Sequence, residues 1–135
     1  MLDSDAPDLK AVLDSMGGTD VVHDTIGGPA FDAALRSLRP EGRYLAIGFA
    51  SGDVPHIPAN LLMVKYLSVI GLYWGAYVAF RPDVLTQSLS TLLTWFAAGT
   101  LTPHISRTLP FAALPEAMDL LRRRAATGKV VLTMP

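Results

Sequence analysis

Residues 19–28 read TDVVHDTIGG, and this stretch decides the fold. Its β-branched residues predict a short strand that ends at Asp24. Gly27, Gly28 and Pro29 then break the strand and open a helix. A strand, a glycine-rich turn and a helix in that order form the repeating unit of a parallel α/β sheet.

Two further strands follow with the same organisation. Residues 39–42 are predicted to form a turn, and residues 43–48 the second strand. A short helix that starts at Pro58 leads to the third strand, which is expected to run from Leu67 to Trp74. Because this third strand is almost wholly apolar, we expect it to be buried on both faces of the sheet.

Helices are predicted on both sides of these strands. The first helix is expected to be capped by Asp5, with Pro7 in its first turn, and to end at Gly17. A long helix starts at Pro82 and ends at Gly99. Its apolar positions at helical spacing are expected to face inward, and they are Val84, Leu85, Leu89, Leu92, Leu93 and Phe96.

The last part of the chain continues the alternation. Residues 102–109 are expected to be extended, a helix starts at Pro115, and residues 129–133 form a last strand. The alternating order of helices and strands predicts a parallel sheet with right-handed crossovers.

Composition and charge exclude several classes of protein. With 11 basic and 12 acidic residues the net charge is −1, which argues against a nucleic-acid or membrane-surface binder. No stretch reaches the ~20 apolar residues of a membrane span. Asp3 and Asp5 follow Met1 closely, which argues against a signal peptide, and the cytoplasm is the expected compartment. The basic run over residues 122–124 is typical of a solvated helix end.

Metal and thiol chemistry are excluded in a similar way. The sequence has no cysteine, so disulfides, iron–sulfur clusters and thiolate zinc sites cannot form within it. His23, His56 and His104 lie far apart without the spacing of metal ligands, and we assign structural or surface roles to them. No metal ligand is therefore predicted.

The tails of the three predicted strands are the place to look for a site. In open parallel sheets, ligands lie beyond the carboxyl ends of the strands. The tails read DTIGG (24–28), IGFASG (47–52) and YWGA (73–76), and each combines glycine with a hydroxyl or aromatic side chain. Glycine lets a ligand approach the backbone, but it also shapes turns, and the tails alone fit both interpretations.

No residue of the chain is a persuasive catalyst. The loop G-x-G-x-x-G that holds a dinucleotide pyrophosphate does not occur in the sequence. Ser51, Asp53 and His56 lie within six residues of one another, and neighbours in sequence rarely form a nucleophilic triad. The acidic residues best placed as cap, turn and strand-end residues are Asp14, Asp20 and Asp24. We therefore predict no catalytic residue.

Several stretches resemble the zinc-free medium-chain dehydrogenases/reductases. Residues 19–28 resemble the region of the fourth strand of the family's dinucleotide-binding domain, and residues 42–52 its fifth strand and loop. Residues 57–62, followed by residues 72–75, are similar to the quinone oxidoreductase (zeta-crystallin-like) branch. Residues 128–132 resemble the family's closing strand. The similarity covers essentially the whole chain in the right order, which makes it more specific than any single motif.

The resemblance implies the α/β class, as a partial Rossmann fold made of the later strands of a parallel doubly wound sheet. Residues 1–100 would be the second half of the dinucleotide-binding domain. Residues 101–135 would be the C-terminal segment that returns to the catalytic domain. Strands one to three, the glycine loop and the catalytic domain would precede this chain in the family, so we expect a C-terminal fragment.

The resemblance also implies which residues contact the NADPH or NADH cofactor, all of them on the three strand tails. Thr25 and Ile26 would lie near the adenosine side of the cofactor. Ile47, Gly48 and Phe49 would contact the nicotinamide ribose. Backbone groups of Leu72, Tyr73 and Trp74 would bind the carboxamide. Lys129 is expected to approach the cofactor late in the fold. Ile26, Ile47 and Leu72 fit a purely core role equally well.

The function that the resemblance implies is NADPH-dependent quinone oxidoreduction. The cofactor would deliver hydride to a small electron-poor acceptor, such as a quinone or an activated alkene. Without the glycine loop, the fragment is expected to bind NADPH poorly and to be inactive alone. Two alternatives stay open: a fragment of a related enoyl or alcohol reductase, or a non-enzymatic assembly module.

The absence of the earlier strands implies two open sheet edges. In the strand order 3-2-1-4-5-6, strand four pairs with strand one, so the edge at Val21 and Val22 would be bare. Bare edges invite pairing with another chain. The opposite edge, the strand from Leu67 to Trp74, resembles the strand through which relatives dimerise. We therefore expect a homodimer or a higher assembly.

Overall fold

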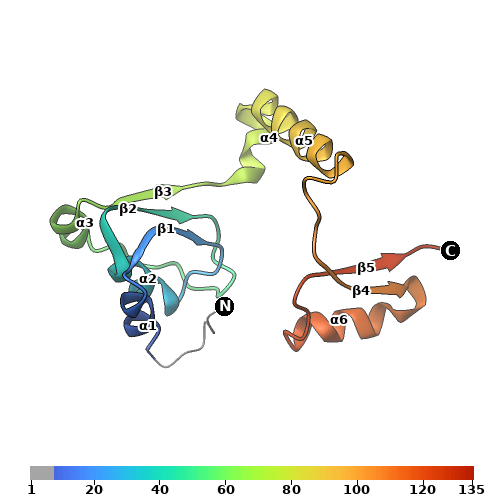
Figure 1. Ribbon diagram of the computed structural model, residues 1–135, viewed down its shortest axis with the longest axis horizontal. Coiled ribbons are helices and arrows are strands. Elements are labelled where there is room, and N and C mark those ends of the chain that lie inside the picture. The colour runs from blue at the N-terminus through green and yellow to red at the C-terminus, as the bar shows by residue number, and fades with distance from the viewer. Residues whose placement is uncertain (1–7) are drawn as a thin grey trace. The chain divides into compact units, whose positions relative to one another are not determined.

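A computed structural model describes residues 8–135 (Figure 1). The chain divides into two units, Met1–Arg81 and Pro82–Pro135. The first unit holds a three-stranded sheet and the second a two-stranded sheet. The expected division into residues 1–100 and 101–135 concerns the two-domain plan of the family and stays a prediction.

The first unit alternates helices and strands, as predicted. Its main elements are α1 (Leu9–Ser15), β1 (Thr19–Asp24), α2 (Ala30–Ser37), β2 (Leu38–Ala46), α3 (Ala59–Lys65) and β3 (Ser68–Gly71). The three strands are parallel and lie in the order β1-β2-β3. The predicted α/β class with a parallel sheet is confirmed.

The core of this unit lies on one face of the sheet. Val22, Tyr44 and Val69 lie side by side across the three strands. They belong to a cluster with Phe31 and Leu35 of α2, which are 4% and 0% exposed. The other members of the cluster are Ala34, Leu38, Leu61, Leu62 and Leu67. Both crossover helices, α2 and α3, therefore cover the same face.

The opposite face of the sheet is open within the described part of this unit. Successive side chains of a strand point to opposite faces, so Val21 and Ile70 turn away from the core. Their side chains are 46% and 44% exposed. The expectation that the third strand is buried on both faces is wrong for this chain, because no described helix of the unit packs on the second face.

The first helix is capped by Asp8, whose carboxylate accepts a 2.9 Å hydrogen bond from the amide three residues on. Asp5 and Pro7, the expected cap and first-turn residues, lie outside the described residues. Asp14, expected at a cap or turn, instead lies within α1 and forms an ion pair with Lys10 one turn earlier.

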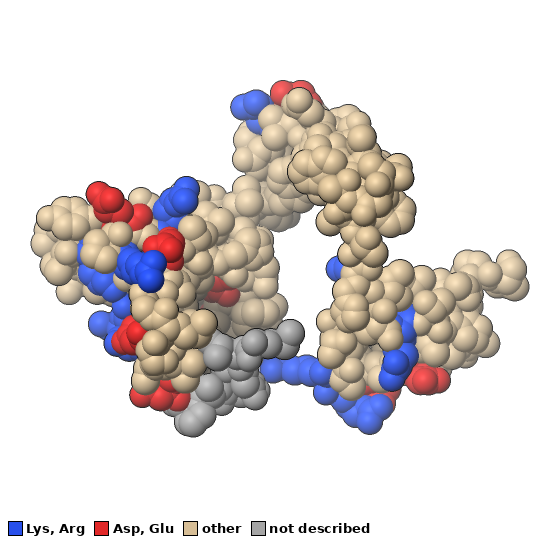
Figure 2. Space-filling model, in the orientation of Figure 1, with Lys and Arg blue, Asp and Glu red and all other residues tan. Residues whose placement is uncertain are grey.

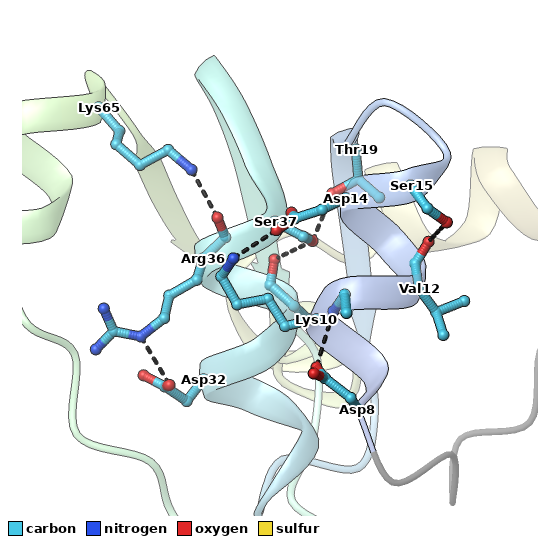
Figure 3. A network of polar contacts seen from close by, with 12 residues as sticks. Asp8, Lys10, Val12, Asp14, Ser15, Thr19, Asp32, Arg36, Ser37 and Lys65 are labelled. Carbon is cyan, nitrogen blue, oxygen red and sulfur yellow. Dashed lines mark hydrogen bonds and ion pairs between the residues drawn. The ribbon is translucent and has the colours of Figure 1, made fainter.

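Polar contacts tie the helices together near the start of the sheet (Figure 3). Lys65 at the end of α3 donates to the carbonyl of Arg36 at 2.7 Å. Arg36 also pairs with Asp32 inside α2 at 2.7 Å. The hydroxyls of Thr19 and Ser37 lie 3.3 Å apart. These contacts lie at the edge where the strands begin.

The second strand begins earlier than predicted. Its pairing with β1 starts at Leu38 rather than Arg43, and residues 39–42 form an irregularity inside the ladder. Arg39 of this irregularity pairs with Asp20 of β1 at 3.2 Å. Asp20, expected in a turn, is therefore a strand residue that holds the irregular segment against β1.

The third strand is shorter than predicted, because the chain turns helical after Leu72. Residues Trp74–Ala76 form a 3-10 turn (η1) that continues into α4 (Tyr77–Phe80). The rings of Trp74 and Tyr77 lie 5.1 Å apart, and those of Tyr77 and Phe80 lie 4.6 Å apart. Aromatic residues three apart meet on one side of a helical turn, which favours this conformation over a longer strand.

The second unit contains the predicted strand–helix–strand order. Its elements are α5 (Pro82–Ala97), β4 (Ile105–Pro110), η2 (Phe111–Ala113), α6 (Leu114–Arg122) and β5 (Lys129–Thr133), and the two strands are parallel. Arg122 and Arg123 both pair with Asp119 at 2.7 Å, so the basic run forms a solvated helix end as expected.

The long helix α5 does not bury the side chains that were expected to face inward. None of its residues is buried. Leu89, Leu92, Leu93 and Phe96 are 40–67% exposed. Charged side chains are nearly absent from its surface in Figure 2. The inward orientation is therefore wrong within the second unit, because no residue of α5 is buried there. None of the helices within residues 8–135 has the length and apolar character needed to cross a bilayer.

Candidate functional site

The tails of β1, β2 and β3 lie together at the carboxyl edge of the first sheet. The amide of Ile47 donates to the carbonyl of Asp24 at 2.8 Å, and the amide of Ser51 donates to the carbonyl of Ile26 at 2.9 Å. The amide of Leu72 donates to the carbonyl of Ala46 at 2.9 Å. The parallel register thus brings three loops, far apart in sequence, to one edge.

A pocket of about 550 Å³ opens between the tails of β2 and β3. Its lining residues are Ala46, Ile47, Gly48, Phe49, Gly71, Leu72 and Tyr73. Phe49 and Tyr73 are 43% and 77% exposed, so two aromatic rings flank an open apolar hollow. The structure therefore brings together the predicted contacts Ile47, Gly48, Phe49, Leu72 and Tyr73.

The other predicted contacts lie outside this pocket. Thr25 and Ile26 follow β1 and are exposed, next to the tail of β2. The ring of Trp74, 38% exposed, packs against Tyr77 of α4. Lys129 lies on β5 in the second unit, where its amide donates to the carbonyl of His104 at 2.8 Å.

The glycines of the strand tails differ in role: some shape turns, and others leave the backbone accessible to a ligand. A Cβ on Gly27 would lie 2.9 Å from the carbonyl oxygen of Asp53, and one on Gly28 would lie 2.9 Å from Ser51. Both glycines also have positive φ angles of 66–67°. They shape a turn and let two loops pack closely. Gly48 and Gly71 instead line the pocket, where they leave the backbone uncovered.

Asp24 and Tyr44 are residues at this edge whose pairing the sequence did not reveal. The Tyr44 hydroxyl donates to the Asp24 carboxylate at 2.6 Å. The same carboxylate accepts from the amides of Ile26 and Gly27 at 2.8 and 2.9 Å. A signal existed: a tyrosine inside a predicted strand of a parallel sheet needs a partner for its hydroxyl once it is buried. An acid at the end of the neighbouring strand supplies one.

This pairing changes the acidity of both groups. Burial favours the neutral acid at Asp24, but the hydrogen bonds from Tyr44 and the amides of Gly27 and Ile26 outweigh it and hold the pKa of that carboxyl below its ordinary value. Burial, reinforced by the hydrogen bond to Asp24 and its charge, raises the pKa of the Tyr44 phenol. Asp24 is therefore an anion and Tyr44 a neutral donor at neutral pH.

The geometry supports neither a triad nor a metal centre. The Ser51 hydroxyl accepts from the amide of Asp53 at 3.2 Å, and no hydrogen bond among the described residues joins it to His56. Within residues 8–135 no group of three or more His, Cys, Asp or Glu side chains could hold a metal ion. The part of the chain that the structure describes therefore offers no set of donors that fits zinc.

The fold is that of an α/β protein with a parallel sheet, and its strand tails meet at an edge that carries a pocket. The sequence model of the zinc-binding dehydrogenase family matches residues 1–132. The chain belongs to this family. The resemblance to the medium-chain dehydrogenases/reductases and their quinone oxidoreductase branch is confirmed.

Curated relatives cover most of this chain. Quinone oxidoreductase-like protein 2 from Bos taurus is 42% identical over 118 residues, which are 87% of this chain and 34% of the relative. Prostaglandin reductase-3 from Bos taurus is 33% identical over 136 residues, covering 87% of this chain and 35% of the relative. The chain therefore spans about a third of the length of these relatives.

Solved structures give the same result. A quinone oxidoreductase from Pseudomonas syringae pv. tomato DC3000 superposes with a TM-score of 0.73 at 26% identity, over 97% of this chain and 41% of that one. A mycobacterial protein solved in complex with NADPH has a TM-score of 0.76 at 24% identity, over 97% and 41% of the two chains, and shares the fold. The matching family model is that of a dehydrogenase, and a further solved structure, 28% identical with a TM-score of 0.72 over 96% of this chain and 36% of that one, is an NAD-dependent alcohol dehydrogenase.

Proposed function

We propose that this chain is the C-terminal part of an NADPH-dependent, zinc-free quinone oxidoreductase and contributes the nicotinamide half of its cofactor site. The observation that carries the proposal is the convergence of three parallel strand tails at one edge of the sheet, where the tails of β2 and β3 line a pocket that includes two glycines. The 42% identity to a quinone oxidoreductase-like protein favours a quinone or another electron-poor acceptor as the substrate.

The pocket fits part of a pyridine nucleotide. A Cβ on Gly48 would lie 3.1 Å from the carbonyl oxygen of Thr25, so glycine lets the β2 tail pack closely on the β1 tail beside the pocket. The amides of Phe49 and Tyr73 donate to no acceptor within the described residues and are free for a ligand. These two donors suit a ribose hydroxyl or a carboxamide oxygen.

Residues of the three strand tails would each bind a different part of the cofactor. When bound, the cofactor supplies the hydride. Ile47, Gly48 and Phe49 would bind the nicotinamide ribose, and Leu72, Tyr73 and Trp74 would orient the carboxamide. Thr25 and Ile26 would lie toward the adenosine side. The apolar side chains of Ile47 and Leu72, which line the pocket, would shield one side of the nicotinamide ring from water.

The same proposal extends to assembly and location. Residues 1–100 would belong to the dinucleotide-binding domain and residues 101–135 to the segment that packs on a catalytic domain. The β3 side of the sheet, from Leu67 to Trp74, would pair with a second copy to form a dimer. The enzyme would act in the cytoplasm.

Titration of the ¹⁵N-labelled chain with NADPH tests the proposal. Because the phosphate-holding loop does not occur in the sequence, we expect weak, millimolar binding, with amide shifts concentrated at Gly48, Phe49 and Tyr73. Gly71→Val is the matched variant, because Gly71 lines the pocket and a Cβ there meets nothing within 4 Å, and it should reduce the shifts. Shifts spread over α5 or α6, or micromolar affinity for the chain alone, would contradict the proposal.

A related enoyl or alcohol reductase is the second candidate. The 33% identity to a prostaglandin reductase favours it, since that relative covers the same share of this chain. Activity of the chain joined to the upstream polypeptide of its gene would separate the two, with a quinone and an enone as competing substrates. A stable complex with another protein and no response to any nicotinamide cofactor would favour an assembly module.

A further inference from the structure

Asp24 and Tyr44 connect the hydrophobic core to the strand tails. Tyr44 is 1% exposed, and its ring meets that of Phe31 edge-on with centroids 4.9 Å apart. Its hydroxyl reaches the Asp24 carboxylate at 2.6 Å. Because a buried hydroxyl without a partner is costly, the core itself requires this acceptor to stay in place.

The remaining contacts of Asp24 lead into two of the three tails. Its carboxylate accepts from the amides of Ile26 and Gly27 at 2.8 and 2.9 Å. Its backbone carbonyl accepts from the amides of Ile47 and Gly48 at 2.8 and 3.3 Å. One residue therefore holds its own tail through the side chain and the tail of β2 through the backbone.

The loop that Asp24 holds packs closely on the loop that follows β2. Gly27 and Gly28 pack so closely on the loop of Ser51 and Asp53 that a Cβ on either would lie 2.9 Å from that loop. Neither Asp24 nor Tyr44 lines the pocket. Any influence of these two residues on a ligand must therefore pass through the tails.

We propose that Asp24 and Tyr44 are positioning residues, which set the tails of β1 and β2 in their ligand-binding shape before a nucleotide arrives. This inference rests on the proposed function for the identity of the ligand. Tails fixed in advance spare the cost of ordering them on binding, so the pair raises affinity without touching the cofactor.

Tyr44→Phe tests the loop directly, because it keeps the ring contact with Phe31 and removes only the hydroxyl. In the ligand-free chain, hydrogen exchange at the amides of Ile26 and Gly27 is expected to become about tenfold faster. The matched control, Leu35→Val, trims the same core away from Asp24. It is expected to speed exchange across the first unit without singling out the tail.

NADPH titration of the same variants supplies the second readout. Half-maximal shifts at Gly48 and Phe49 are expected to need about fivefold more NADPH in Tyr44→Phe than in the unaltered chain, and the same amount in Leu35→Val. Should Tyr44→Phe fail to fold, Asp24→Asn serves instead and is expected to give the same local increase in exchange.

The outcomes separate the inference from the function beneath it. Equal exchange at Ile26 and Gly27 in Tyr44→Phe and Leu35→Val would overturn the positioning role. A change in exchange with unchanged NADPH titration would overturn it as well, since the loop would then be irrelevant to binding. If the unaltered chain shows no NADPH shifts at millimolar concentration, the proposed function fails, while the exchange comparison still decides whether the pair orders the tails.

Discussion

Helices α2 and α5 carry the same kind of apolar pattern but meet different surroundings. Phe31 and Leu35 of α2 are 4% and 0% exposed, whereas α5, twice as long, buries none of its residues. The spacing of apolar residues predicts a helix and its apolar face. Burial requires a second surface, and each unit taken by itself supplies one for α2 but not for α5. The comparison teaches that apolar spacing predicts a helix and its apolar face but not whether that face is covered.

The largest expected effect contrasts these two helices directly. Leu35→Ala should lower the free energy of unfolding by about 3 kcal/mol, because it leaves a cavity in the closed core. Leu89→Ala on α5, where the side chain is 47% exposed, should change it by less than about 0.5 kcal/mol. Urea unfolding measures both. A large loss in Leu89→Ala would show that the face of α5 is covered in solution.

Association is the next test, since both the sheet edge and α5 are open. If copies pair along β3, Ile70→Lys should raise the dissociation constant of the dimer about tenfold, because a lysine on an edge strand blocks strand pairing. Leu93→Lys on α5 is the matched variant. Sedimentation measures the dissociation constant of the dimer in each variant. A larger increase in Leu93→Lys than in Ile70→Lys would show that the interface lies on α5. A monomer in the unaltered chain would refute the dimer.

Acid should weaken the core-to-tail connection by a smaller amount. The folded pKa of Asp24 lies below its ordinary value, so its contribution is complete above roughly pH 4 and disappears as the pH falls through the folded value. Asp24→Asn should lower the free energy of unfolding by about 1 kcal/mol at pH 7. The loss of stability toward low pH should be smaller in this variant than in the unaltered chain. The test is the free energy of unfolding in urea, measured from pH 2 to pH 7. If it falls equally steeply toward low pH in Asp24→Asn and in the unaltered chain, this linkage is refuted.

The smallest effect on stability is expected at Gly71. A Cβ there meets nothing within 4 Å, so Gly71→Ala should change the unfolding free energy by less than about 0.5 kcal/mol. The added methyl projects from a pocket-lining position and should nevertheless weaken NADPH shifts at Tyr73. Unchanged shifts would place the nucleotide elsewhere on the tails.

The candidate site was predictable to a limited extent. The tails that include Ile47, Gly48 and Leu72 could be located from the sequence, because parallel strands place their carboxyl ends at one edge. The role of Gly27 and Gly28 could not, because it depends on a loop that packs on them from Ser51 and Asp53. The helical turn after Leu72 was missed, since its aromatic contacts compete with an apolar run that suits a strand equally well.

The sequence by itself determined the order of the helices and strands and the parallel sheet, because apolar spacing, glycine and proline act over a few residues. Only the tertiary structure decided which apolar faces are covered and that Tyr44 meets Asp24, 20 positions away. That contact arises from the register between β1 and β2. Register depends on how whole strands pack, which no local pattern of residues specifies.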